Sequence, residues 1–230
     1  MGVGETMKHD TSIIIPAYNE AAWIRETLRS LRAHPLLREC QLIVVDDGST
    51  DDTALLAASW ADRVVRLLQN EGKGSALRRG IEVAEGQHFL FVDADLGSTA
   101  REMIRLLEFL QSEKVDMVIA SPLHILKGGF GWTKRMARRK IYRLTGARIE
   151  APLSGQRALT RRAVDAVRNW NCGFGIEAVM TLDILKAGLL VCELPLSFRH
   201  REYGRTLAGF WHRGRQYAAI QKAMTAREVR

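Results

Sequence analysis

Short apolar runs that alternate with amphipathic helical segments constrain the fold of this chain most strongly. Each run of Ile, Leu, Val or Phe ends at proline or at turn residues, a pattern typical of buried strands. Strands that alternate with helices at this spacing need crossover connections, so the sequence predicts an α/β protein with a mostly parallel sheet. The expected strands or extended stretches are 12–16, 41–46, 63–68, 88–93, 115–120, 153–159 and 189–198, and the expected helices are 20–33, 52–61, 72–84, 101–112, 161–168, 176–186 and 206–226.

Polar clusters follow four of these strands. They are Tyr18-Asn19-Glu20, Asp46-Asp47-Gly48, Gly72-Lys73-Gly74 and Asp93-Ala94-Asp95. Ligands of parallel sheets bind beyond the carboxyl ends of the strands. We therefore expect the four clusters to converge on one site.

The apolar run before Asp93 ends in two carboxylates, Asp93 and Asp95. A strand alternates its faces, so the pattern predicts that both side chains project the same way. Two like charges there repel each other unless positive charge compensates them. A divalent cation bound to a diphosphate would supply it, because Mg²⁺ and Mn²⁺ accept one or two protein carboxylates plus phosphate and water. Alternatively, Asp95 only begins a turn or caps the next helix.

Length and composition fit one soluble globular domain with a C-terminal extension. The chain has 230 residues, of which 47% are hydrophobic and 26% are charged. No stretch reaches the ~20 apolar residues of a membrane span, and the start lacks the apolar core of a signal peptide. We therefore expect a cytoplasmic protein.

The formal net charge is +8, which predicts an anionic partner. Residues 127–148 hold eight Lys or Arg and no acid, with apolar residues at the spacing of a basic amphipathic helix. This excess of positive charge could bind phosphates, a nucleotide, an anionic membrane face or nucleic acid. A nucleic-acid-binding protein is an alternative, although no helix-turn-helix, zinc-finger or RNA-recognition signature is present.

Five motifs in fixed order resemble the family 2 glycosyltransferases. They are Pro16-Ala17-Tyr18-Asn19-Glu20, Asp46-Asp47-Gly48-Ser49-Thr50-Asp51-Asp52-Thr53, Gly72-Lys73-Gly74-Ser75-Ala76, Asp93-Ala94-Asp95 and Ser154-Gly155. The resemblance is strongest over residues 12–100, and within the family it is closest to the soluble polyprenyl-phosphate (dolichol-phosphate) sugar synthases. It implies a GT-A fold, a nucleoside-diphosphate sugar such as a UDP or GDP sugar, and Mg²⁺ or Mn²⁺. Residues 12–120 would be the nucleotide-sugar-binding half, and 121–230 the acceptor-side half with a C-terminal basic helix.

The resemblance also implies roles on the donor side. The residues expected to bind the nucleotide sugar are Pro16, Ala17, Tyr18, Glu20, Asp47, Gly72, Lys73, Asp93 and Ala94. Glu20 would accept from ribose hydroxyls, and Asp47 would contact the base. The alternatives are that Glu20 favours a helix N-terminus and that Asp47 builds an Asx turn.

The resemblance implies that Asp93 and Asp95 are catalytic. Asp95 would be a metal ligand, and Asp93 would contact ribose, a metal-bound water or the donor sugar. The polyprenyl-phosphate pattern usually has Gln two residues past the second Asp, but this chain has Gly97. We therefore consider His200 as a further metal ligand, since imidazole suits Mn²⁺ better than Mg²⁺. His200 could equally be a surface or packed histidine.

The acceptor side is predicted at Ser154 and Gly155. Arg157, with Arg138 or Arg139, would neutralise an acceptor phosphate or the leaving diphosphate. Arg201 and Arg205 would form a flap over the pyrophosphate. Each of these arginines could instead be a solvated charge. Glu177 would be a general base for a hydroxyl acceptor, or only a helix-capping acid.

The resulting hypothesis is metal-dependent transfer of a sugar, with inversion, to a polyprenyl phosphate. The basic segment would rest on the inner face of the cell membrane. The same donor chemistry on a soluble acceptor, either a phosphorylated small molecule or a cell-wall sugar, is the alternative. The base, the sugar and the oligomeric state stay open, a dimer being one option.

Overall fold

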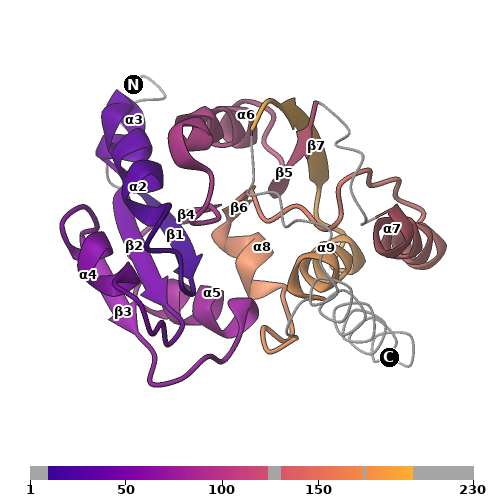
Figure 1. Cartoon of the computed structure of the whole chain (residues 1–230). Coiled ribbons are helices and arrows are strands. Elements are labelled where there is room, and N and C mark those ends of the chain that lie inside the picture. Colours follow the sequence, from indigo (N-terminus) through magenta and orange to yellow (C-terminus); the bar gives the residue numbers. More distant parts are fainter. Residues whose placement is uncertain (1–9, 124–130, 173–174, 199–230) are drawn as a thin grey trace.

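A computed structural model describes residues 10–123, 131–172 and 175–198. It has the alternating strands and helices that the sequence predicts (Figure 1). The elements are β1 (Thr11–Ala17), α2 (Ile24–Ala33), α3 (Pro35–Arg38), β2 (Gln41–Asp46), α4 (Thr53–Ala58), β3 (Arg63–Arg66), α5 (Lys73–Glu82), β4 (His88–Phe91), the 3₁₀ helix η1 (Gly97–Met103), α6 (Ile104–Ser112), β5 (Met117–Pro122), α7 (Gly131–Thr145), β6 (Arg157–Thr160), α8 (Arg161–Asp165), α9 (Ile176–Lys186) and β7 (Val191–Leu196).

The strands form one mixed sheet in the order β3-β2-β1-β4-β6-β5-β7. The pairs β1–β2, β1–β4, β2–β3 and β5–β7 are parallel, which confirms the mostly parallel prediction. Strand β6 is the exception, because it lies antiparallel between β4 and β5. Its register pairs Phe91 with Arg157, so the segment entering β6 lies beside the chain leaving β4.

Helices cover both faces of the sheet because successive strand residues point to opposite sides. On β1, Ile13 and Ile15 join a buried cluster with residues of α2 and α6, whereas Ile14 joins a second cluster with residues of α5 and α9. Figure 1 shows these helix pairs on opposite sides of the strands. The result is a three-layer α/β/α arrangement with two apolar cores.

Several predicted boundaries shift in the structure. Strand β4 ends at Phe91, so Asp93 and Asp95 lie in the following turn, and the strand alternation used to orient them was wrong. The 3₁₀ helix η1 precedes α6 where one helix was predicted from residue 101. Strand β6 begins at Arg157 instead of Leu153, because the preceding residues form a loop. The predicted C-terminal helix over 206–226 lies outside the described residues.

Helix α7 lies within the predicted basic amphipathic segment. Its Ala137 and Ile141 are buried in the same core cluster as residues of α9, whereas Trp132 and Tyr142 are exposed. Among the helices in the described ranges, none has the length and apolar content needed to cross a membrane.

The central strand β4 provides a test of the core. Leu90 is fully buried between β1 and β6, so Leu90→Ala is expected to lower the free energy of unfolding by about 2–5 kcal/mol through lost contacts and a cavity. Leu55 on α4 is 70% exposed, so Leu55→Ala is expected to change it by no more than about 0.5 kcal/mol. Denaturant unfolding measures both values, and equal costs would contradict this packing.

Candidate active site

The loops after β1 and β2 are joined by hydrogen bonds at the carboxyl end of the sheet. The backbone N–H of Asn19 donates to Ser49 Oγ at 2.9 Å, and that of Glu20 donates to Thr53 Oγ1 at 2.8 Å. Tyr18, beside them, is 45% exposed, so its ring is available to a ligand. Two of the predicted clusters therefore lie side by side.

Asp47 connects the loop after β2 to the start of α5. Its Oδ1 accepts the N–H of Glu71 and its Oδ2 accepts the N–H of Gly72, each at 2.8 Å. Burial raises the pKa of this carboxyl, and the two N–H donors oppose that shift. Each oxygen retains a second lone pair with which it could accept a hydrogen bond from a base. Contact between Asp47 and a base therefore stays a prediction, in addition to the structural role of Asp47 in joining the two segments.

Lys73 lies between two predicted catalytic carboxylates. Its Nζ is 2.6 Å from Asp93 Oδ1 and 2.8 Å from Glu177 Oε1, so α5, the end of β4 and α9 meet there. Burial alone would lower the pKa of the Lys73 ammonium, but the two carboxylates outweigh burial and raise it. Lys73 therefore stays protonated, and it supplies positive charge that the sequence argument assigned to a metal.

The antiparallel strand β6 brings Gly155 and Gln156 to Asp93. Gln156 is fully buried, and its Nε2 donates to Asp93 Oδ2 at 2.6 Å. A Cβ placed on Gly155 would lie 2.5 Å from both Asp93 Oδ2 and Lys73 Nζ. Only glycine allows the backbone to pass so close to the ion pair, which gives the predicted site residue Gly155 a packing role.

The turn that carries Ala94 and Asp95 is anchored to α2. Thr27 Oγ1 donates to the Ala94 carbonyl at 2.7 Å and accepts the N–H of Gly97 at 2.9 Å. Gly97 has φ +53°, and a Cβ there would lie 3.4 Å from the Glu26 carboxylate. A side chain at position 97 would therefore be strained and would meet an acid that the sequence analysis did not consider. Asp95 itself is partly exposed.

Arg157, predicted to neutralise a phosphate, lies inside the protein, and its phosphate role stays a prediction. Its side chain is fully buried, and its guanidinium donates to the carbonyls of Ser154 and Pro152 and to Thr181 Oγ1 at 2.8–3.0 Å. Burial lowers the pKa of Arg157 to about 10. The arginine therefore fixes the loop before β6 from inside the protein.

Glu193 holds the other end of the same loop and was missed by the sequence analysis. Its carboxylate accepts the backbone N–H of Glu150 at 2.7 Å and that of Ala151 at 2.6 Å. An acid inside the otherwise apolar run Val191–Leu196 is the available signal for such a role. Ser154 consequently lies in a loop fixed at both ends.

The remaining predicted residues are placed as follows. Arg138 pairs with Glu150, and Arg139 is exposed. Pro16 and Ala17 end β1. His200, Arg201 and Arg205 lie outside the described residues, so their predicted roles stay predictions.

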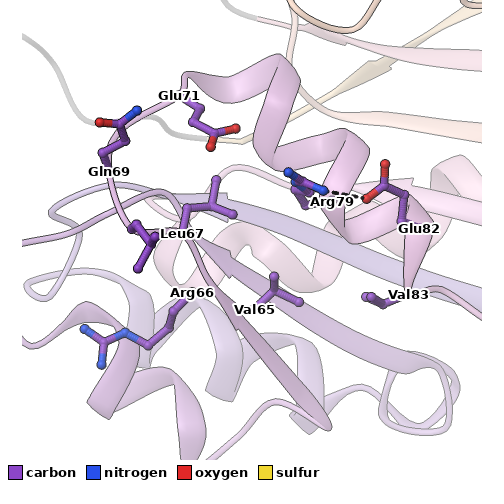
Figure 2. Close-up of a pocket in the computed structure, with 9 residues that line it drawn as sticks. Val65, Arg66, Leu67, Gln69, Glu71, Arg79, Glu82 and Val83 are labelled. Carbon is purple, nitrogen blue, oxygen red and sulfur yellow. Dashed lines mark hydrogen bonds and ion pairs between the residues drawn. The ribbon is translucent and has the colours of Figure 1, made fainter.

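A surface hollow of about 610 Å³ lies between the edge strand β3 and α5 (Figure 2). Its lining includes Arg66, Gln69 and Glu71, and Arg79 pairs with Glu82 one turn along α5 at 3.2 Å. None of the sequence-predicted site residues lines it. The chemistry-bearing side chains gather instead around Lys73.

Comparison with known proteins gives one family and several relatives. The profile of "Glycosyl transferase family 2" matches residues 12–168. Glycosyltransferase AglJ of Haloferax volcanii is 30% identical over 198 residues, covering 84% of this chain and 64% of AglJ. An undecaprenyl-phosphate 4-deoxy-4-formamido-L-arabinose transferase of Pseudomonas paraeruginosa is 29% identical over 206 residues, covering 85% and 59%. This chain therefore spans less than two thirds of either relative.

Solved structures of glucosyl-3-phosphoglycerate synthase from Mycobacterium tuberculosis share this fold. The complex with Mn²⁺, UDP-glucose and phosphoglyceric acid has a TM-score of 0.75 and 27% identity, covering 98% of this chain and 84% of the synthase. The complex with Mg²⁺ and UDP has a TM-score of 0.77 and 25% identity, covering 99% and 83%.

Close packing at Gly155 leads to a prediction about stability. Gly155→Ala is expected to lower the free energy of unfolding by about 1–3 kcal/mol, because the added methyl group must displace Asp93 or Lys73. In an Asp93→Ala background the same change is expected to cost clearly less, since the nearest carboxylate is gone. Thermal and denaturant unfolding of the four proteins test this coupling, and additive costs would contradict it.

Proposed function

Because this chain belongs to glycosyl transferase family 2, we propose that it transfers a sugar from a nucleoside-diphosphate sugar to an acceptor. One observation carries the proposal: the ion-paired cluster of Lys73, Asp93 and Glu177 lies at the edge of the sheet where the predicted donor loops meet. Ligands of open α/β sheets bind at this edge. The GT-A fold is proposed with it.

The donor nucleotide is proposed to bind between the loops after β1 and β2. Exposed Tyr18 offers a stacking surface for the base, and Glu20 offers oxygens to the ribose. The backbone N–H of Glu20 donates to Thr53 Oγ1, and the Asp47 carboxylate accepts the N–H of Gly72, so the Glu20 backbone and the Asp47 side chain are positioned before a ligand arrives. The solved relatives that contain UDP or UDP-glucose support a UDP sugar as the first donor to test.

Asp95 is proposed to hold Mg²⁺ or Mn²⁺ against the donor diphosphate. The donor set suits this assignment, because Asp95 is a partly exposed carboxylate in the turn after β4 and hard oxygen ligands suit both cations. Within the described ranges, no three His, Cys, Asp or Glu residues form a group that could hold a metal alone. Phosphate oxygens, water and His200 are proposed to complete the shell. When bound, the metal would stabilise charge on the leaving diphosphate.

Transfer is proposed to proceed with inversion, by attack of an acceptor oxygen on the anomeric carbon. An ionised phosphate acceptor needs no general base, and Glu177 would then orient the donor sugar. For a hydroxyl acceptor, Glu177 would take up the proton. Asp93 is proposed to contact the ribose or the sugar, and Lys73 to fix both carboxylates at the reacting centre.

A polyprenyl phosphate is the proposed acceptor, and a soluble phosphorylated molecule is the second candidate. The first is supported by the relative named as an undecaprenyl-phosphate transferase, and the second by the solved relatives that contain phosphoglyceric acid. Both carry a phosphate. The fixed loop at Ser154, beside the ion-paired cluster, is proposed to face it.

The outer face of α7 supports a peripheral membrane contact. Trp132, Arg135, Arg139 and Tyr142 are exposed at spacings of three and four residues, so they share one face of the helix. The helix contains no acid. Arginines attract anionic lipid headgroups, and Trp and Tyr favour the membrane interface. We propose that this face rests on an anionic bilayer and presents the lipid phosphate.

Loss of the metal ligand provides a test of the proposed chemistry. Asp95→Asn is expected to reduce sugar transfer by about a hundredfold or more, because the diphosphate loses its charge partner. Release of UDP from UDP-glucose with Mn²⁺ is measured with a polyprenyl phosphate and, separately, with phosphoglycerate as acceptor. Full activity of this variant would refute the metal role, and the preferred acceptor distinguishes the two candidates.

The membrane contact is tested with two charge-reversed variants of equal net charge. Arg135→Glu/Arg139→Glu on α7 is expected to weaken binding to phosphatidylglycerol vesicles by about tenfold or more, since each basic residue contributes about 1 kcal/mol. Arg25→Glu/Arg29→Glu changes two exposed residues of α2 at the same spacing and is expected to bind more tightly than the α7 variant. Equal weakening in vesicle sedimentation would show that net charge alone matters.

A further inference from the structure

Gln156 makes an unusual pair of contacts with Asp93. Its Nε2 donates to Asp93 Oδ2 at 2.6 Å, and its Oε1 accepts the backbone N–H of Asp93 at 2.9 Å. The residue is fully buried directly before β6. One side chain thus holds both the carboxylate and the backbone of a predicted catalytic residue.

The two hydrogen bonds between Gln156 and Asp93 lie just beyond the carboxyl end of β4. Val92 still donates its N–H to Ile14 of β1 at 3.1 Å, but β4 itself stops at Phe91. The backbone N–H of Asp93, two residues further on, donates to the side-chain amide oxygen of Gln156 instead of to a strand. With Oδ1 on Lys73 and Oδ2 on Gln156, the carboxylate has one defined orientation.

We infer that Gln156 is a positioning residue that fixes the Asp93 carboxylate for binding of the donor, an inference that rests on the proposed function. An amide is required because it donates to the carboxylate and accepts from the N–H at the same time. A methionine of similar length can do neither. A glutamate keeps the acceptor but loses the donor, and it adds negative charge beside Asp93 and Glu177.

Lys73, Gly155 and Arg157 do not duplicate this contact. Lys73 from α5 is shared with Glu177, and Gly155 has no side chain with which to support the carboxylate. Arg157, the next residue along the chain, points its guanidinium at Ser154, Pro152 and Thr181 instead. Without the amide, the Asp93 carboxylate loses the hydrogen bond on Oδ2 that fixes its orientation relative to Lys73.

The test measures the affinity for UDP-glucose with Mn²⁺ by calorimetry. Gln156→Met is expected to weaken binding by about tenfold, the contribution of a hydrogen bond to a charged group. Asp93→Ala is expected to weaken it at least as much. If Gln156 acts through Asp93, the double variant binds like Asp93→Ala to within about twofold.

Gln41 offers a matched control at the opposite edge of the sheet. Its Oε1 accepts from Ser12 Oγ at 2.7 Å and from the Glu85 N–H at 3.0 Å, at the start of β2. Gln41→Met also removes two hydrogen bonds, one of them part-buried, so it is expected to lower the melting temperature while leaving UDP-glucose affinity unchanged.

Wild-type affinity in Gln156→Met would overturn the inference, as would a double variant whose losses simply multiply. Should Gln156→Met not fold, Gln156→Glu is measured in its place, with weaker binding expected and unchanged binding overturning the inference. Failure of the wild-type protein to bind any of UDP, GDP, CDP or dTDP with Mn²⁺ would instead overturn the proposed function, and the positioning role would fall with it. Wild-type nucleotide binding therefore tests the proposed function, and the Gln156 variants test the positioning role.

Discussion

The ammonium group of Lys73, held between two carboxylates, is the interaction on which the candidate site depends. Asp93 and Glu177 come from opposite halves of the chain, and both carboxylates lie within 2.8 Å of Lys73 Nζ. Without this shared cation the two carboxylates would repel each other. Because the carboxylates are partly buried, the lower dielectric constant strengthens both their mutual repulsion and their attraction to the Lys73 ammonium. Because Lys73 begins α5, the ion pair also fixes how that helix enters the site.

The topology of the sheet explains how distant segments reach this cation. The parallel strands β1, β2 and β4 place three polar loops at one edge, as their order requires. The antiparallel β6 then runs beside β4 and brings Gly155 and Gln156 to Asp93 from the second half of the chain. The segment after β4 and the loop before β6 therefore meet at Asp93.

The sequence predicted what depends on local pattern. Apolar runs ended by Asp46-Asp47 and Asp93-Asp95 located the strands and the site edge, because burial and turn chemistry act within a few residues. The partners of Gln156, Glu193 and Arg157 were not predictable in this way. Their hydrogen bonds depend on the reversed strand β6 and its register, which arise from long-range pairing. The burial of Arg157 follows from the antiparallel position of β6 beside β4, which the residues around Ser154 and Gly155 do not reveal.

A structure of the protein with UDP and Mn²⁺ would test the proposed donor site, since Mn²⁺ can be located by its anomalous scattering. Manganese is expected on the Asp95 carboxylate, with the base beside Tyr18 and Asp47 and the diphosphate within reach of the Lys73 cluster. Nucleotide bound in the hollow beside β3, or manganese remote from Asp95, would contradict this expectation.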